Sequence, residues 1–566
     1  MARRRQIEGI PFLRSLSGLE DVYRGTAAAV LPLLDRLGIH LDSHLSVGLA
    51  VRSWVRYLRA QHLPEVKGCV AIFAMRNPTW FDWAMYAACW MRRLGYAPIV
   101  IYAREDQRRV FSREAGLRHW TNVQGAWAAF EKLPDLTLVE LESAPQASAE
   151  KIAEYDEFAA EAAHMIAAYE LYVEERETVA KVDEYKEFYP KAWGEMATWA
   201  ARMELLLSNL EKRFGIRRIL GYSGMINLTA AMEEAARRVG WTRMWVESWC
   251  TKPGEMIWNE NGPALTPDYK TWVEAMDDWG PQDERDIDDF LYFQEHNRPA
   301  PKAGSEKDFD QHRQYQQSST EDPLPEFVRE FVDRDDRPIA LVGPNVIGDS
   351  ATFGRATIFD SQREWIGELA DYFKGHREYR MIIRAHPGER FQAALAQLPV
   401  RLGDVAAEAA GDAENILVIP GAQPCSTYVL MRKARLMLNW VSNVGIDAIL
   451  RDLPTISAGR PFYAGMGITL EPSSRQEYYE QLDKLISGPR ETSAQQKLLA
   501  KKYLAVLYKE RPVTAFGAQY RARDLRLDHP LDSGYGVFYR VLAGELPNLT
   551  RFHRMHNRRD RSPLPA

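Results

Sequence analysis

The chain has 566 residues, with 72 basic and 78 acidic side chains and a formal net charge of −6. A charge balance this close to neutral excludes the strongly basic surface that nucleic-acid-binding domains need, so no nucleic-acid partner is expected. With 46% hydrophobic residues and 16 tryptophans, the chain can form roughly two to four domains with large cores.

The cysteines and the apolar segments indicate the cellular compartment in which the protein is expected. The four cysteines are scattered and include no Cys-x-x-Cys pair, so neither a disulfide framework nor a zinc site is predicted, and a reducing cytoplasm fits. No apolar run reaches the roughly 18 residues of a transmembrane helix. The start, MARRRQIEGIP, is basic but has no apolar segment, so it does not predict a secretory signal. We expect a cytoplasmic protein.

The first half of the chain alternates predicted strands and helices. The apolar run 69–75 predicts a buried strand, 80–94 a helix that Gly95 ends, and 97–102 a second strand. This order predicts a parallel pair with a right-handed crossover. Other predicted elements are helices over 1–65, strands at 136–141, 216–222 and 242–247, a helix at 227–239, and a charge-rich helical hairpin or insertion over about 150–214.

The second half repeats this alternation after a segment rich in Pro, Gln and Ser at 297–325, whose composition predicts a linker or loop. The predicted elements are strands at 338–343, 379–384, 416–419, 434–440 and 454–457, and helices from Asp360 to 373 and at 426–433, 445–450, 474–488 and 493–509. We therefore predict an α/β protein with two Rossmann-like domains that face a cleft, assigned to 1–296 and 326–520, with an extension at 521–566.

Polar residues gather where three strands of the second half end. The first loop, 343–355, offers Ser350 and Arg355 to a phosphate, and its glycines allow close backbone approach. It is neither a P-loop nor a GxGxxG motif, so this loop alone is a weak signal. The second loop follows the apolar strand MII with Arg384 and His386, at the carboxyl end where open α/β sheets bind ligands. Alternatively, His386 only caps the strand end, and Arg384 is a salt-bridged structural residue.

The third loop, 440–448, leads into a predicted helix. Ser442 and Asn443 precede that helix, and free amides near Gly445 at its positive end suit an anion. Simple helix capping is the alternative. Asp447 in the first turn either complements the helix dipole or accepts a ribose hydroxyl. A phosphate-bearing ligand would account for all three loops at once.

These motifs resemble the bacterial capsule polysaccharide biosynthesis family, which is similar to the sialyltransferases and Kdo transferases of the GT-B fold. The resemblance rests on a strand that ends in His-Pro, on a strand that leads into Ser-x-x-Gly-x-acid-Ala, and on a following Gly-Arg-Pro segment. The matching residues are His386-Pro387, 442–448, 459–465 and 349–355, with Tyr222-Ser223-Gly224, 245–247, Pro253-Gly254 and Asn261-Gly262 in the first half. The chain departs from the family pattern at Asp447, where Glu is usual, and at Ser248, where Gly is expected.

The resemblance implies a GT-B glycosyltransferase whose second half binds a nucleotide sugar, with CMP-linked donors a candidate class, and whose first half binds a glycan or lipid-linked acceptor. His386 would hydrogen-bond the donor phosphate and stabilise charge on the departing nucleotide. Arg384 or Arg355 would add positive charge. Ser442, Asn443 and the amides at Gly445 would hold phosphate.

The catalytic base has two candidates in the first half. Glu247 ends a predicted strand and should face the cleft, although it could instead pair with Lys252 or Arg243. Asp82 lies at the start of a predicted helix, where it could simply be the cap. The acidic pairs Asp335-Asp336 and Asp288-Asp289 lie in charged stretches rather than at strand ends, so we expect neither a metal site nor a cofactor.

Three alternatives remain open on this fold: a nucleotide-sugar epimerase, a polyol-phosphate transferase, and a non-catalytic protein of polysaccharide assembly. The segment 551–561, RFHRMHNRRDR, has five arginines and one acid, which could give reversible contact with an anionic membrane. A basic tail that is simply solvated, or that pairs with acidic patches, is the other interpretation.

Overall fold

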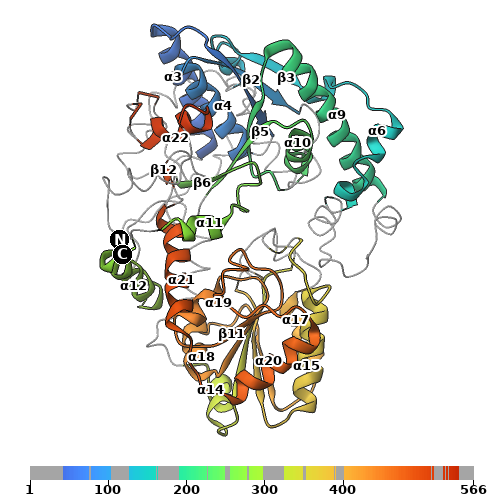
Figure 1. Ribbon diagram of the computed structural model, residues 1–566, viewed down its shortest axis with the longest axis vertical. Helices are drawn as coiled ribbons and strands as arrows, with labels where there is room; N and C mark the ends of the chain where they lie inside the picture. Colours follow the sequence, from blue (N-terminus) through green and yellow to red (C-terminus); the bar gives the residue numbers. More distant parts are fainter. Residues whose placement is uncertain are drawn as a thin grey trace, which may run out of the picture.

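The structure is a computed structural model in which two α/β halves lie one above the other (Figure 1). It describes residues 43–75, 78–103, 127–160, 162, 190–225, 227–248, 255–276, 279–296, 324–347, 352, 354–387, 389, 401–510, 513–514, 527–528, 531–532 and 534–546. The predictions for Ser350, for most of 297–325 and for the tail 551–561 lie outside these residues. Within these ranges no helix is both long and apolar enough to cross a membrane.

The first half is built on a seven-stranded sheet with the order β12-β6-β5-β4-β1-β2-β3. The strands β1 to β5 pair in parallel, whereas β6 is antiparallel to β5 and β12 is antiparallel to β6. The strands are β1 (Gly68–Ala74), β2 (Tyr96–Tyr102), β3 (Thr137–Glu140), β4 (Arg218–Tyr222), β5 (Thr242–Ser248), β6 (Glu255–Glu260) and β12 (Val513–Thr514). The sequence did not predict β6 or β12.

Both faces of this sheet are covered, which is why its strands are continuous apolar runs. Val70 and Ile72 of β1 face one hydrophobic core, and Ala71 and Phe73 face the other, as the two-residue period of a strand requires. Helices α3 and α4 contribute to the first core, and α9 and α10 to the second. The helices of this half are α3 (Ser43–Ala60), α4 (Pro78–Arg93), α6 (Ala149–Ala153), α9 (Pro190–Phe214), α10 (Asn227–Arg238), α11 (Tyr269–Glu274) and α12 (Pro281–His296), with a 3₁₀ turn at Leu141–Ser143.

The second half has a five-stranded parallel sheet with the order β11-β10-β7-β8-β9. Its strands are β7 (Ile339–Gly343), β8 (Arg380–Arg384), β9 (Ile416–Ile419), β10 (Leu436–Asn439) and β11 (Thr455–Ser457). Its helices are α14 (Glu326–Asp333), α15 (Gln362–Gly375), α17 (Leu402–Ala410), α18 (Thr427–Lys433), α19 (Val444–Ile449), α20 (Arg475–Ser487) and α21 (Ala494–Ala505). The predicted mixed α/β fold with two Rossmann-like halves is confirmed.

One predicted helix start is wrong by one residue. The N-cap of α15 is Ser361, whose hydroxyl accepts from the Glu364 amide at 3.0 Å, rather than Asp360. Asp360 instead donates its own amide to the Glu364 carboxylate at 2.7 Å. Serine and aspartate both cap helices well, so the sequence alone did not decide between the two adjacent residues.

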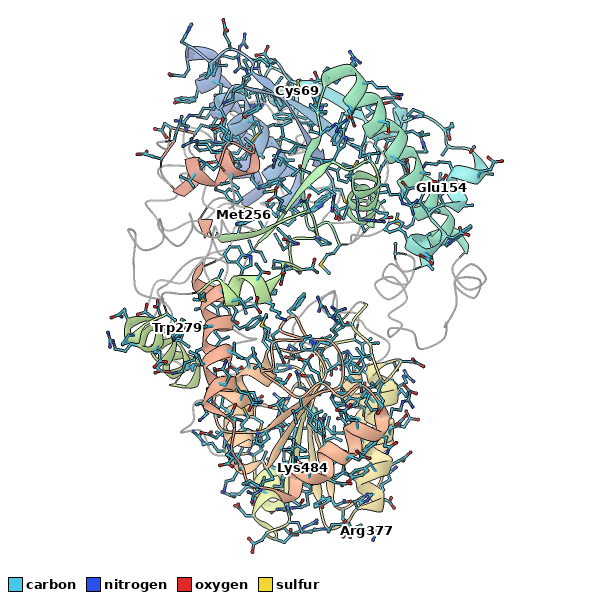
Figure 2. All side chains as sticks on the ribbon, in the orientation of Figure 1. Cys69, Glu154, Met256, Trp279, Arg377 and Lys484 are labelled. Atoms are coloured by element: carbon cyan, nitrogen blue, oxygen red, sulfur yellow. The ribbon has the colours of Figure 1, made fainter. Side chains whose placement is uncertain are left out.

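The carboxyl ends of both parallel sheets point toward the other half. In Figure 2, Cys69 at the start of β1 lies far from the second half, whereas Met256, which pairs with Ser248 at the end of β5, lies on the facing side. Arg377, just before β8, lies at the far end of the second half. The strand-end loops of the two sheets are therefore turned toward each other.

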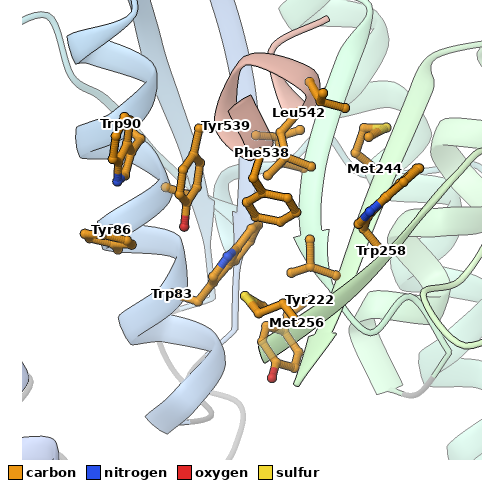
Figure 3. Close-up of a cluster of buried hydrophobic side chains, with 14 of the residues drawn as sticks. Trp83, Tyr86, Trp90, Tyr222, Met244, Met256, Trp258, Phe538, Tyr539 and Leu542 are labelled. Carbon is orange, nitrogen blue, oxygen red and sulfur yellow. The ribbon is translucent and has the colours of Figure 1, made fainter. Parts of the chain in front are cut away.

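The last described elements return to the first half. Helix α21 continues as a π-helix at Val506–Glu510, after which β12 joins the first sheet and α22 (Gly534–Leu542) packs against α4. Figure 3 shows Tyr539 of α22 beside Trp90, and their rings are stacked with centroids 5.0 Å apart. From the sequence, 521–566 is predicted only as an extension, because nothing in its composition reveals that α22 completes a core begun about 450 residues earlier.

Candidate active site

The second sheet has a topological switch point between β7 and β10. These neighbouring strands send their connections to opposite sides, and open α/β sheets bind their ligands at the carboxyl ends of such a pair. The loops beyond them meet there, since Asn345 Oδ1 accepts a hydrogen bond from the Val441 amide at 3.2 Å. Gly343 at the end of β7 allows this approach, because a Cβ atom on it would lie 3.1 Å from Val444 and 2.5 Å from Met437. The predicted loops after β7 and β10 therefore meet at this edge of the sheet.

The His386 turn is held closely at the end of β8. His386 is partly buried, and its carbonyl accepts a hydrogen bond from the Glu389 amide at 3.1 Å. A Cβ atom on Gly421 would lie only 2.5 Å from the same carbonyl, so the loop after β9 can pack here only with glycine at that position. The main chain of His386 is thus fixed from two sides.

Arg384 is buried beneath this turn. Its side chain is 3% exposed and donates to the carbonyls of Ala385, Pro420 and Gln423 at 2.9, 2.8 and 3.1 Å. Burial lowers the pKa of the guanidinium. No ion pair with a carboxylate is found for it among the described residues. Arg384 therefore braces the loop after β9 through main-chain carbonyls, rather than through the salt bridge of the structural alternative, and its charge adds a positive potential next to His386.

Glu389 is a residue of this turn that the sequence analysis did not single out. Its carboxylate is 4% exposed and accepts from the amides of Leu402 and Gly403, the first two residues of α17, at 3.0 and 3.3 Å. Burial raises the pKa of this carboxyl to about 7. Only the fold brings α17 to it, although its place three residues after His386 was visible in the sequence.

The loop after β10 contains the predicted phosphate-binding residues. Ser442 Oγ accepts from the Val444 amide at 3.3 Å, and the Gly445 amide donates to the Ser442 carbonyl at 3.3 Å. Asn443 is the N-cap of α19 but makes no side-chain capping bond; its Oδ1 accepts from the Tyr503 hydroxyl at 3.3 Å. The amides of residues 444 and 445 are thus used inside the loop, and the Ser442 hydroxyl still has its proton to donate.

The two remaining described candidates of this half, Asp447 and Arg355, make local contacts. Asp447 on α19 lies 3.9 Å from the Arg451 guanidinium, which also donates to its carbonyl at 2.9 Å. The Arg355 guanidinium lies 3.7 Å above the ring of Phe462 and donates to the Arg460 carbonyl at 3.0 Å. Arg355 thus ties the loop after β7 to the loop after β11.

A cavity of about 470 Å³ lies beside these two loops. Its volume is in the range of small-molecule sites. Desolvation raises the pKa of Glu471 on its wall, and the carboxylate of Glu471 accepts from the Gly465 amide at 2.9 Å. The lining residues are Thr357, Ile358, Ser457, Gly459, Arg460, Ala464, Gly465, Glu471, Pro472 and Ser473. Part of the 459–465 segment that carries the family resemblance therefore lines a cavity.

The two candidate bases lie in the first half. Glu247 is partly exposed near the carboxyl end of β5. Arg243, one of the two partners that the sequence offered it, is 2.9 Å from Glu233 on α10. Asp82 is 3% exposed and lies one turn inside α4, which begins at Pro78, so it is not the cap of that helix.

The first sheet has the same switch point, between β1 and β4. The turn after β4 contains Ser223 at φ 67° and Gly224 at φ 77°. A Cβ atom on Gly224 would lie 2.8 Å from the Trp245 ring, so the turn needs glycine both for its backbone angle and for space. The Ser223 carbonyl accepts from the Ala264 amide at 2.9 Å, which ties the segment leading to α11 to this edge. This turn is part of the resemblance in the first half.

Comparison with protein families agrees with the resemblance seen in the sequence. Residues 294–499 match the model of the family described as capsule polysaccharide biosynthesis protein. The resemblance is thus confirmed for this part of the chain, which contains β7 to β11 and all three ligand loops of the second half. A search of curated proteins finds no match.

Solved structures with a distant likeness include two transferase chains and an epimerase. The Thermosulfurimonas dismutans KpsC beta Kdo 2,7 transferase is 12% identical, covering 54% of this chain and 81% of its own, with a TM-score of 0.30. The beta Kdo 2,4 transferase of the same organism is 15% identical, covering 53% and 81%, with a TM-score of 0.31. The Neisseria meningitidis UDP-GlcNAc 2-epimerase is 12% identical, covering 77% and 95%, with a TM-score of 0.24.

Proposed function

We propose that this protein is a glycosyltransferase of bacterial capsule or surface polysaccharide biosynthesis, which moves a sugar from a nucleotide-sugar donor to a glycan acceptor. One observation carries the proposal: residues 294–499, which match the capsule polysaccharide biosynthesis family, contain the whole second sheet and the loops at its carboxyl edge. Open α/β sheets bind phosphate-bearing ligands at this edge. The acceptor would bind to the first half, whose strand ends face this edge.

In the proposed mechanism the second half stabilises the departing nucleotide. His386 would donate a hydrogen bond to the donor phosphate, and the buried charge of Arg384 would favour the developing negative charge. The Ser442 hydroxyl and the Asn443 side chain would orient the phosphate. Glu247, or Asp82, would take the proton from the acceptor hydroxyl. Each of these roles is a proposal that mutagenesis can test.

The function is tested first by donor binding and then by product analysis. CMP, CDP, UDP and GDP are compared by thermal shift, because a ligand at 100 times its dissociation constant stabilises the folded state by about 2.7 kcal/mol. The nucleotide sugars of the base that binds are then supplied with labelled sugar and a capsule oligosaccharide. Transfer of label to the oligosaccharide is expected. Label that stays on an epimerised nucleotide sugar would indicate an epimerase, and no binding of any nucleotide would contradict both.

We also expect transfer activity to survive EDTA. In each of the two Asp-Asp sequences that could have held a metal ion, one carboxylate forms an ion pair. Asp335 lies 2.8 Å from Arg337 and 3.3 Å from Arg380, and Asp288 lies 2.9 Å from Lys501. The hydrogen bond from Arg337 also lowers the pKa of Asp335, which keeps that carboxylate ionised for its arginine partners. Initial rates after dialysis against EDTA test this expectation. Loss of activity that magnesium or manganese restores would show that a metal is required.

A further inference from the structure

A buried pair of polar side chains lies under the Ser442 loop. Asn439, the last residue of β10, is fully buried, and its Nδ2 donates to the Ser442 carbonyl at 3.0 Å and to the Tyr463 hydroxyl at 2.9 Å. Its Oδ1 accepts from the Ser442 amide at 3.1 Å. The Tyr463 hydroxyl donates to the same Ser442 carbonyl at 3.0 Å. Both main-chain polar groups of Ser442 are therefore bound to this pair.

The loop is also packed tightly against the pair. A Cβ atom on Gly445 would lie 2.5 Å from the Tyr463 hydroxyl oxygen and 2.9 Å from Asn439 Nδ2. This contact explains the glycine of the Ser-x-x-Gly motif, because any larger residue would push the loop away from the two side chains. Gly445 thus makes room for the hydrogen bonds that hold Ser442.

The ring of Tyr463 does not need its hydroxyl in order to be buried. A buried phenylalanine would bury the same ring surface without the cost of removing a polar group from water. Tyr463 is fully buried, and desolvation raises the pKa of its phenol, so the hydroxyl stays protonated and can donate. What the hydroxyl adds at this position is its hydrogen bonds, to the Ser442 carbonyl of the loop and with the buried side chains of Asn439 and Ser457.

We propose that Tyr463 and Asn439 are positioning residues, which hold Ser442 in the conformation that binds the phosphate of the nucleotide-sugar donor. This inference rests on the proposed function. Neither side chain is exposed, so neither touches the ligand. With the main chain of Ser442 fixed from below, its Oγ and the start of α19 keep one geometry, and the donor does not have to order the loop on binding.

Tyr463→Phe separates positioning from stability. The change keeps the ring but removes one donor from the Ser442 carbonyl and one acceptor from Asn439. We expect the donor KM and the donor dissociation constant to rise about tenfold, which corresponds to about 1.4 kcal/mol, with kcat changed by less than about twofold. Steady-state rates at saturating acceptor and calorimetric titration with the donor nucleotide measure the two quantities.

Tyr478→Phe is the matched control. Tyr478 is also fully buried in the second half, but its hydroxyl accepts from Trp365 Nε1 at 2.9 Å rather than contacting the loop. Both variants are expected to lose some thermal stability, whereas only Tyr463→Phe should weaken donor binding. Amide exchange of the 440–446 peptide should likewise increase only in Tyr463→Phe.

Ser442→Ala in combination with Tyr463→Phe tests whether the effect passes through Ser442. If it does, the double variant binds the donor about as weakly as Ser442→Ala alone, because the losses of affinity from two coupled residues do not add. The inference would be overturned if the losses of donor affinity in the two single variants added fully in the double variant. It would also be overturned if Tyr463→Phe and Tyr478→Phe had equal donor KM. In either case a wild type that is active would leave the proposed function in place. A wild type that neither binds nor uses any nucleotide sugar would overturn the proposed function, and this inference with it.

Discussion

Replacing His386 with alanine is expected to lower turnover by about 10²- to 10³-fold, which is the usual effect of removing one donor that stabilises charge in a transition state. His386 lies at the carboxyl end of β8, beside the buried positive charge of Arg384, and in the proposed mechanism it donates to the phosphate of the departing nucleotide. Negative charge grows on that phosphate as the glycosidic bond breaks. The lost interaction should therefore reduce kcat more than it raises the donor KM.

The fold should tolerate this change, because main-chain contacts of His386 hold the turn: its carbonyl accepts from the Glu389 amide and lies against Gly421. His376→Ala is the matched control. That histidine follows α15, next to Arg377 at the end of the second half farthest from the first (Figure 2), and its ring stacks on Tyr372 with centroids 4.0 Å apart. Turnover of His376→Ala should stay near that of the wild type. Near-normal turnover of a correctly folded His386→Ala would exclude His386 from the mechanism.

Glu389 is expected to make the stability of the wild type fall between about pH 5 and pH 7. Its carboxyl is buried against the first amides of α17, and desolvation is the largest cause that raises its pKa from 4.5 to about 7. A carboxyl with a raised pKa binds its proton more tightly in the folded state than in the unfolded state. The favourable contribution of this carboxyl to the free energy of unfolding is therefore complete below its unfolded pKa and is lost as the pH rises through its folded pKa.

The size of this effect follows from the shift of the pKa. Each pKa unit corresponds to about 1.36 kcal/mol. A shift of the Glu389 pKa from 4.5 to about 7 therefore changes the free energy of unfolding by about 3 kcal/mol between a pH below the unfolded pKa and a pH above the folded pKa. Two charged groups act on Glu389: Asp404 raises its pKa and Arg401 lowers it. The Glu389 carboxylate also offsets part of the burial effect that lowers the pKa of the nearby Arg384.

Glu389→Gln removes this titration. The thermal midpoint of the wild type should fall from pH 5 to pH 8 by more than that of Glu389→Gln, and the two curves should converge toward the acid end. Glu477→Gln is the control, since Glu477 also accepts from a main-chain amide, that of Ser473 at 2.7 Å, but its pKa is lowered by this bond. Parallel curves for the wild type and Glu389→Gln between pH 5 and pH 8 would show that Glu389 does not titrate there.

The sequence by itself determined the fold class and the position of the strand-end loops that are proposed to bind the donor. Runs such as 339–343 and 380–384 are entirely buried strands, and their apolar length and the polar or glycine residues after them are local signals. Because the strands of a parallel sheet end at one edge, placing His386 and Ser442 after two such strands was enough to predict that they border the same edge. The catalytic and binding roles of these residues stay predictions.

Only the tertiary structure decided how the side chains at this edge are used. The sequence left Arg384 between a ligand role and a structural one, because its acceptors Pro420 and Gln423 belong to a loop more than thirty residues away. From the sequence, Asn439 is predicted only as a residue near the end of a strand, and Tyr463 only as part of a loop. Their bonds to Ser442 depend on how β10 lies beside the loop after β11, and such long-range geometry is set by packing rather than by local preference.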